Sequence, residues 1–157
     1  MTEKDRITVK VDVLVRKPPS EVFAALVDPI AITKFWLSRS SGELKAGHTV
    51  RWDFKVPGSA VDTTVTALTT DRLIEIAWSD GTAIHFTFKP HPLGTHIQVE
   101  NSGFSGSYEE RVNAALDASQ GFTVVLCDLK TFLESGQQMH LSRDKAILIE
   151  EGQKNLR

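Results

Sequence analysis

The sequence predicts an α+β fold in which a curved antiparallel sheet of about six strands wraps around one long C-terminal helix. Three observations indicate it: a strand-like segment at 7–16, a run of five more at 49–101, and a helical pattern over 108–134. The strand pattern leaves one apolar face, which needs a cover, and only the long helix is large enough to supply it. Two short helices are expected between the first and second strands.

The composition is that of one globular domain. Of 157 residues, 41% are hydrophobic and 24% are charged, which argues against a disordered chain. Lys and Arg number 18 against 20 Asp and Glu, a net charge of −2, so the basic surface of a nucleic-acid-binding protein is not expected. The start at 1–6 lacks the apolar segment of a secretory signal, and no apolar run reaches membrane-spanning length. We therefore expect a cytoplasmic protein that binds neither nucleic acid nor membranes.

The first elements are predicted from local signals. Residues 7–16 alternate apolar, mostly β-branched, and other side chains, as a half-buried strand does. Two prolines end this strand, and Ser20 is expected to cap a short helix over 21–27. Residues 30–37 indicate a second short helix or turn, and the polar stretch 38–47 indicates a loop.

Turn signals between 49 and 101 fix a trial register for each hairpin. The signals predict turns at 57–58, 69–72, 80–82 and 90–94. A slip of one residue would expose the apolar face, so we expect the registers that bury it. They predict one row across the sheet: Trp52, Thr63, Trp78, Ile84 and Asn101. Polar residues such as Arg51, Asp53 and Lys55 are assigned to the opposite, solvated face, where His85 falls opposite Glu100.

Apolar residues at 3–4 spacing predict the long helix over 108–134, with Gly136 as its stop. Ser142 is expected to cap one more helix, over 143–155. We therefore predict a single domain over 1–136, followed by a partly helical extension over 137–157.

Four segments resemble a known superfamily. They are PPSEVFAAL at 18–26, Phe35-Trp36, LIEIAW at 73–78, and the glycine-aromatic start and Leu-Glu-x-Gly end of 121–136. The chain resembles the START-like (SRPBCC, helix-grip) superfamily and, within it, the activator of heat-shock protein 90 ATPase homologue family. The resemblance covers about 7–136 and implies the helix-grip fold. It implies little about function, because this superfamily includes lipid carriers, hormone receptors, polyketide cyclases and chaperone regulators.

The inward-facing row predicts a ligand cavity between the sheet and the long helix. Aromatic rings would supply contact area, while Thr63 and Asn101 would orient a polar group. Phe35 and Trp36 would act as a gate at the mouth, and Phe104 in its glycine-flanked loop is a similar candidate. The alternative is that these side chains are ordinary core. The full set expected to line the cavity is Phe35, Trp36, Trp52, Phe54, Thr63, Ile76, Trp78, Ile84, Phe86, Val99, Asn101, Phe104, Phe122 and Leu126.

No residue pattern predicts catalysis, a metal or a cofactor. His91 and His96 fit no zinc spacing, and the lone Cys127 is expected to be a small buried hydrophobe. An enzyme of the cyclase, hydratase or isomerase kind would need an ionisable group inside the cavity, and the inward rows offer none.

The favoured interpretation is a module that binds a small apolar or aromatic molecule. The alternative is a regulator that binds a chaperone, as the family name implies, through the outer strand face and the tail at 142–157. A homodimer is left open, and an enzyme is the least favoured interpretation.

Overall fold

The computed structural model describes residues 6–155. The charged start at 1–5 and the end of the predicted extension, 156–157, lie outside the described residues. In chain order the elements are β1 (Val9–Val15), α1 (Pro19–Val27), the 3₁₀ helix η2 (Ala31–Lys34), β2 (Leu37–Ser40), β3 (Thr49–Phe54), β4 (Ala60–Thr69), β5 (Leu73–Trp78), β6 (Ala83–His91), β7 (Gly94–Ser102), α2 (Tyr108–Ser135) and α3 (Leu141–Asn155).

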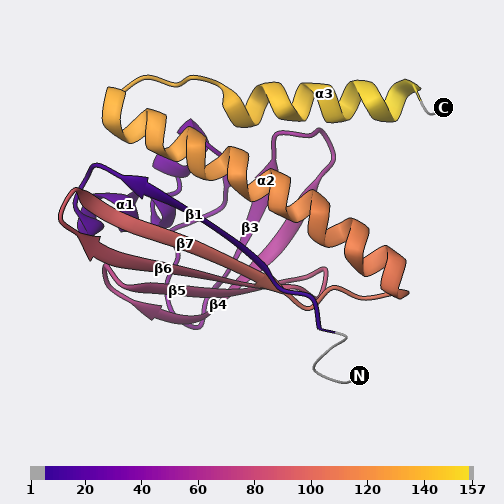
Figure 1. Ribbon diagram of the computed structural model, residues 1–157, viewed down its shortest axis with the longest axis horizontal. Coiled ribbons are helices and arrows are strands. Elements are labelled where there is room, and N and C mark those ends of the chain that lie inside the picture. Colours follow the sequence, from indigo (N-terminus) through magenta and orange to yellow (C-terminus); the bar gives the residue numbers. More distant parts are fainter. Residues whose placement is uncertain (1–5, 156–157) are drawn as a thin grey trace.

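The predicted α+β fold is confirmed. Seven antiparallel strands form one curled sheet in the order β1-β7-β6-β5-β4-β3-β2, and α2 crosses the sheet while α3 runs above α2 (Figure 1). The strand missed by the sequence patterns is β2, which lies largely in the stretch expected to be a loop. It is a short edge strand, held on β3 by pairs such as Ser40 with Trp52, and four residues are too few to display an alternation.

The helices begin and end at identifiable signals. Ser20 does not cap α1, because Pro18 takes the cap position and Ser20 lies inside the first turn. The long helix begins at a capping box, in which Ser107 and Glu110 each bond the other's backbone N–H, at 3.1 and 3.2 Å. It ends at Gly136, whose φ of 74° is the left-handed conformation that glycine adopts without strain.

The hairpin between β3 and β4 is shifted by two residues from its predicted register. The turn at 57–58 is present, but the strand before it bends at residues 55–56. Trp52 therefore pairs with Val61 and not with Thr63. A shift of two leaves the paired residues 49–53 on their predicted faces, because side chains in a strand alternate with period two.

The hairpin between β5 and β6 shows the same kind of shift. Its three-residue loop occupies 79–81, one residue earlier than predicted. Gly81 takes the left-handed position with φ 93°, and its N–H donates to the Trp78 carbonyl over 3.0 Å. Trp78 consequently lies opposite Thr82, and not opposite Ile84 as predicted. Its backbone N–H donates to the Thr82 carbonyl over 2.9 Å. Trp78 thus sits at the rim of the sheet, beside the hairpin loops.

The remaining predicted pairs are confirmed: Thr63 with Trp78, and Ile84 with Asn101. His85 also lies opposite Glu100 as predicted. Its closest acid is Glu75, with 3.5 Å between the His85 Nδ1 and Glu75 Oε1 atoms. Cys127 differs from expectation, since it is exposed on the outer side of α2.

Candidate functional site

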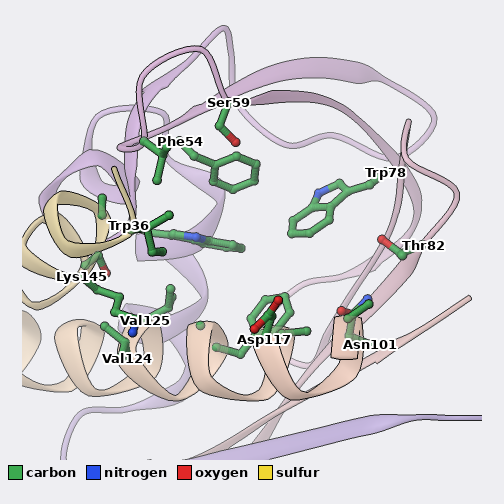
Figure 2. Close-up of a pocket in the computed structure, with 18 of the residues that line it drawn as sticks. Trp36, Phe54, Ser59, Trp78, Thr82, Asn101, Asp117, Val124, Val125 and Lys145 are labelled. Atoms are coloured by element: carbon green, nitrogen blue, oxygen red, sulfur yellow. The ribbon is translucent and has the colours of Figure 1, made fainter. Parts of the chain in front are cut away.

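A pocket of about 580 Å³ lies where the rim of the sheet, α2 and α3 meet (Figure 2). The hairpin loops after β3 and β5 form one side, and residues 114–125 of α2 form the floor. Ser59, Asp80 and Asp117 line the pocket and are exposed, so it opens to solvent. Its lining residues are Trp36, Phe54, Lys55, Val56, Ser59, Trp78, Asp80, Thr82, Asn101, Phe104, Ser105, Ala114, Asp117, Ala118, Gly121, Phe122, Val124, Val125, Ser142, Lys145, Ala146 and Ile149.

Four aromatic rings form the apolar wall, and Trp36 is at their centre. Its ring centroid lies 5.9 Å from that of Phe122, and 6.3 Å from those of both Phe54 and Trp78. Phe122 stacks on Trp78 with an interplanar angle of 17°. Such contacts stabilise the cluster beyond simple area burial and present flat apolar surfaces to the pocket.

Six of the residues predicted to line a cavity lie on this pocket: Trp36, Phe54, Trp78, Asn101, Phe104 and Phe122. The other eight lie in the core behind it, with at most 1% of their surface exposed: Phe35, Trp52, Thr63, Ile76, Ile84, Phe86, Val99 and Leu126. Phe35 packs under the C-terminal end of α2, its ring 6.4 Å from that of Phe132, away from the pocket mouth. The predicted lining set thus divides into buried core and the wall of a pocket whose floor is the stretch 114–125 of α2.

One end of the pocket is polar and carries negative charge. The amide nitrogen of Asn101 donates to the Ala83 carbonyl over 3.0 Å, which leaves its amide oxygen as the acceptor that it can offer. Thr82 donates both its hydroxyl and its backbone N–H to the Asp80 carboxylate, at 2.6 and 2.8 Å. Asp117 of α2 faces the pocket between this end and the aromatic wall (Figure 2).

Lys55 at the other end is a residue that the strand pattern misplaced. Alternation put it on the solvated outer face, but the bend at residues 55–56 turns it into the pocket. Its ammonium donates to the Thr33 carbonyl over 3.3 Å. Burial lowers the pKa of Lys55; the Asp128 carboxylate opposes this effect, while the nearby Arg143 cation adds to it. The pocket therefore holds a perturbed ionisable group, which the inward rows did not predict.

The C-terminal helix supplies the last wall. Ser142, Lys145, Ala146 and Ile149 of α3 all line the pocket. The Ser142 hydroxyl donates to the Phe35 carbonyl over 2.6 Å, and its N–H donates to Asp128 over 2.9 Å. The prediction that Ser142 caps this helix is wrong, because α3 begins at Leu141 and the Ser142 hydroxyl donates to the body of the domain. No signal in the sequence indicated that the extension completes the pocket.

Three buried polar atoms beside the pocket have no hydrogen-bond partner within residues 6–155: the indole nitrogens of Trp52 and Trp78 and the hydroxyl of Thr63. Most buried polar groups are paired. The aromatic wall is consequently held by ring packing and apolar burial.

Across the described part of the chain, no three His, Cys, Asp or Glu side chains are grouped so that they could hold a metal ion. Among residues 6–155, no helix is both long enough and apolar enough to cross a membrane.

A sheet curled around a long C-terminal helix, with two short helices after the first strand, is the helix-grip fold of START-like proteins. Residues 16–134 match the family described as activator of Hsp90 ATPase homolog 1-like protein. The chain therefore belongs to this family, as the resemblance predicted.

Solved structures show the same fold. A Staphylococcus saprophyticus protein is 25% identical, with a TM-score of 0.75 over 85% of this chain and 96% of its own. A Mesorhizobium loti protein is 24% identical, with a TM-score of 0.72 over 82% of this chain and 98% of its own. The Aha1 dimer of Colwellia psychrerythraea is 20% identical, with a TM-score of 0.72 over 82% of this chain and 96% of its chain. No curated protein matches the sequence.

Proposed function

We propose that the protein binds a small, largely apolar molecule in the pocket between the rim of the sheet, α2 and α3. The supporting observation is an open, aromatic-walled pocket of about 580 Å³, within the range of roughly 300–1,000 Å³ typical of small-molecule sites. The Trp36, Phe54, Trp78 and Phe122 side chains give a flat ligand large contact area. Burial of apolar surface, worth about 25 cal/mol per Å², would supply the driving force.

Gly121 offers a direct test. It lines the floor of the pocket, and a Cβ built there meets no atom within 4 Å. A side chain at this position therefore enters free space. Gly121→Leu should narrow the pocket at its floor, whereas Gly121→Ala should leave most of the space open and strengthen α2 by about 1 kcal/mol. The alanine variant is thus a matched control for any effect on the helix.

The measurement is saturable binding of the neutral fluorescent probe N-phenyl-1-naphthylamine. We expect Gly121→Leu to weaken binding at least tenfold and Gly121→Ala to change it less than twofold, both variants unfolding at or above the wild-type temperature. Absence of saturable binding by the wild-type protein, or equal affinity in the leucine variant, would overturn the proposal.

Protein binding is the second candidate, favoured by apolar side chains that α3 exposes. Ile147, Leu148 and Ile149 are 43%, 63% and 41% exposed. The family name and the dimeric Colwellia relative point in the same direction. Sedimentation of the wild-type protein and of Leu148→Glu tests self-association, and retention on an immobilised Hsp90-type ATPase tests the chaperone partner. A monomer that does not bind the ATPase would rule this candidate out.

A further inference from the structure

Charge is distributed unevenly along the pocket. Lys55 and Lys145 line the end beneath α3, whereas Asp80 and Asp117 lie toward the hairpin loops. In Figure 2, Lys145 lies beside Val124 and Val125, across the pocket from Thr82 and Asn101. A ligand with one charged group would therefore bind in one orientation.

The charges that act on Lys55 are of both signs. Burial lowers the pKa of Lys55, the Asp128 carboxylate opposes the change, and the Arg143 and Lys34 cations reinforce it. One Asp128 carboxylate oxygen accepts the Ser142 N–H, and the other is buried with no hydrogen-bond partner among residues 6–155. Two cations and one carboxylate thus act on Lys55, so an anionic group placed beside its ammonium would be favoured.

Among residues 6–155, neither lysine forms an ion pair within 4 Å. Lys55 donates to a neutral carbonyl, that of Thr33, over 3.3 Å. Lys145 follows Ser142 by one helical turn, so both lie on the pocket side of α3. Both lysines are half-buried. In such a partly desolvated setting, a charge-assisted contact is stronger than one in open water.

We propose that the ligand is a flat, aromatic organic anion, with its anionic group at Lys55 and Lys145 and its apolar body against Phe54, Trp78 and Phe122. This inference rests on the proposed small-molecule binding and specifies the ligand class. Asp80 and Asp117 would repel the anion from the opposite end. There the Asn101 amide oxygen would accept a hydrogen bond from a hydroxyl or amine on the far edge of the ligand.

Two probes that share an aromatic scaffold test the charge preference. 8-Anilinonaphthalene-1-sulfonate carries an anionic group that N-phenyl-1-naphthylamine lacks. We expect the wild-type protein to bind the sulfonate about tenfold more tightly than the neutral probe. Raising the salt concentration should weaken the sulfonate alone, because salt screens the charged contact.

Lysine variants test which residues cause the preference for the anionic probe. Lys145→Gln and Lys55→Gln should each weaken binding of the sulfonate several-fold more than binding of the neutral probe. Lys154→Gln is the matched control: it lies on the same helix, outside the pocket, and pairs with Glu150 at 3.2 Å. If Lys55→Gln fails to fold, the Lys145 variant and the salt series still decide the question.

The outcomes separate the two proposals. Binding of the neutral probe with no preference for the sulfonate, or a preference retained in Lys145→Gln, overturns the anion inference and leaves the pocket proposal intact. If Gly121→Leu weakens the binding of neither probe, the pocket proposal itself fails.

Discussion

The carboxylate of Asp128 accepts a hydrogen bond from the backbone N–H of Ser142 over 2.9 Å, and both residues are buried. The bond joins α2 to the first turn of α3. Because the Ser142 hydroxyl also donates to the Phe35 carbonyl, this one turn is tied to two separate parts of the chain. The position of the α3 wall of the pocket therefore depends on Asp128.

Asp128→Ala should release this wall. The Ser142 N–H loses its acceptor in a buried position, which costs about 2 kcal/mol. Asp128→Asn, which keeps an acceptor oxygen, should lose less. Urea unfolding measures both, with exposed Asp62→Ala as the control. An Asp128→Ala midpoint equal to that of the wild type would show that the bond does not stabilise the fold.

Thr63 and Thr95 make a matched pair for the energetics of buried hydroxyls. Both are fully buried. The Thr95 hydroxyl donates to the Lys17 carbonyl over 2.7 Å, whereas that of Thr63 has no partner among residues 6–155. Replacing an unpaired hydroxyl by a methyl group of the same shape removes a desolvation penalty. Thr63→Val should therefore stabilise the protein by about 1 kcal/mol.

Thr95→Val should instead destabilise it by about 1–2 kcal/mol, because the Lys17 carbonyl loses its donor. Thermal and urea unfolding of the two variants give the comparison. A loss of stability in Thr63→Val would mean that its hydroxyl is hydrogen-bonded in solution, for example to a buried water.

The sequence could predict which face each strand buries, but not every partner across the sheet. Alternation fixes the register of a hairpin only to a multiple of two. The bend at 55–56 and the position of the left-handed Gly81 then decide the pairing, and both are local backbone choices. This is why Thr63 and Trp78 pair as predicted while Trp52 and Thr63 do not.

The site was predictable where it consists of inward-facing aromatic residues, such as Trp78 and Phe122. Lys55 was missed because a bend overrides strand alternation. The contribution of α3 was missed because it depends on the long-range bond between Ser142 and Asp128. Neither residue lies in a motif, and their contact joins positions on two different helices.

Gly94 is expected to be intolerant of any side chain. It has φ 145°, and a Cβ there would overlap the Val15 carbonyl oxygen and lie 2.8 Å from the Lys17 nitrogen. These are backbone atoms at the end of β1, which cannot rotate away. Gly94→Ala should therefore cost more than about 3 kcal/mol.

Gly58→Ala is the control for Gly94. Its φ of 79° is also positive, but no atom lies within 4 Å of the added carbon. Gly58→Ala should lower the free energy of unfolding only by the cost of the left-handed conformation, about 1–2 kcal/mol. Similar losses of unfolding free energy in the two variants would show that close approach to β1 is not the constraint.

Glu134 links the end of α2 to β1, and its effect on stability should depend on pH. Its carboxylate accepts hydrogen bonds from the Lys130 ammonium over 2.6 Å and from the Arg16 backbone N–H over 3.0 Å. Lys130 also donates to the Leu14 carbonyl over 2.7 Å. Desolvation by burial alone would raise the pKa of Glu134, but the bonds from Lys130 and Arg16 outweigh it and hold the pKa below its ordinary value of 4.5.

A carboxyl group whose pKa is lower in the folded state stabilises the fold when ionised. Its contribution is complete above the ordinary value of 4.5 and is lost as the pH falls through the lower, folded-state pKa. Glu134→Gln should therefore be less stable than the wild type by about 1 kcal/mol at neutral pH. The two unfolding free energies should converge in acid, whereas exposed Glu151→Gln should match the wild type throughout. A Glu134→Gln deficit that stays constant with pH would assign the loss to packing and not to the charge.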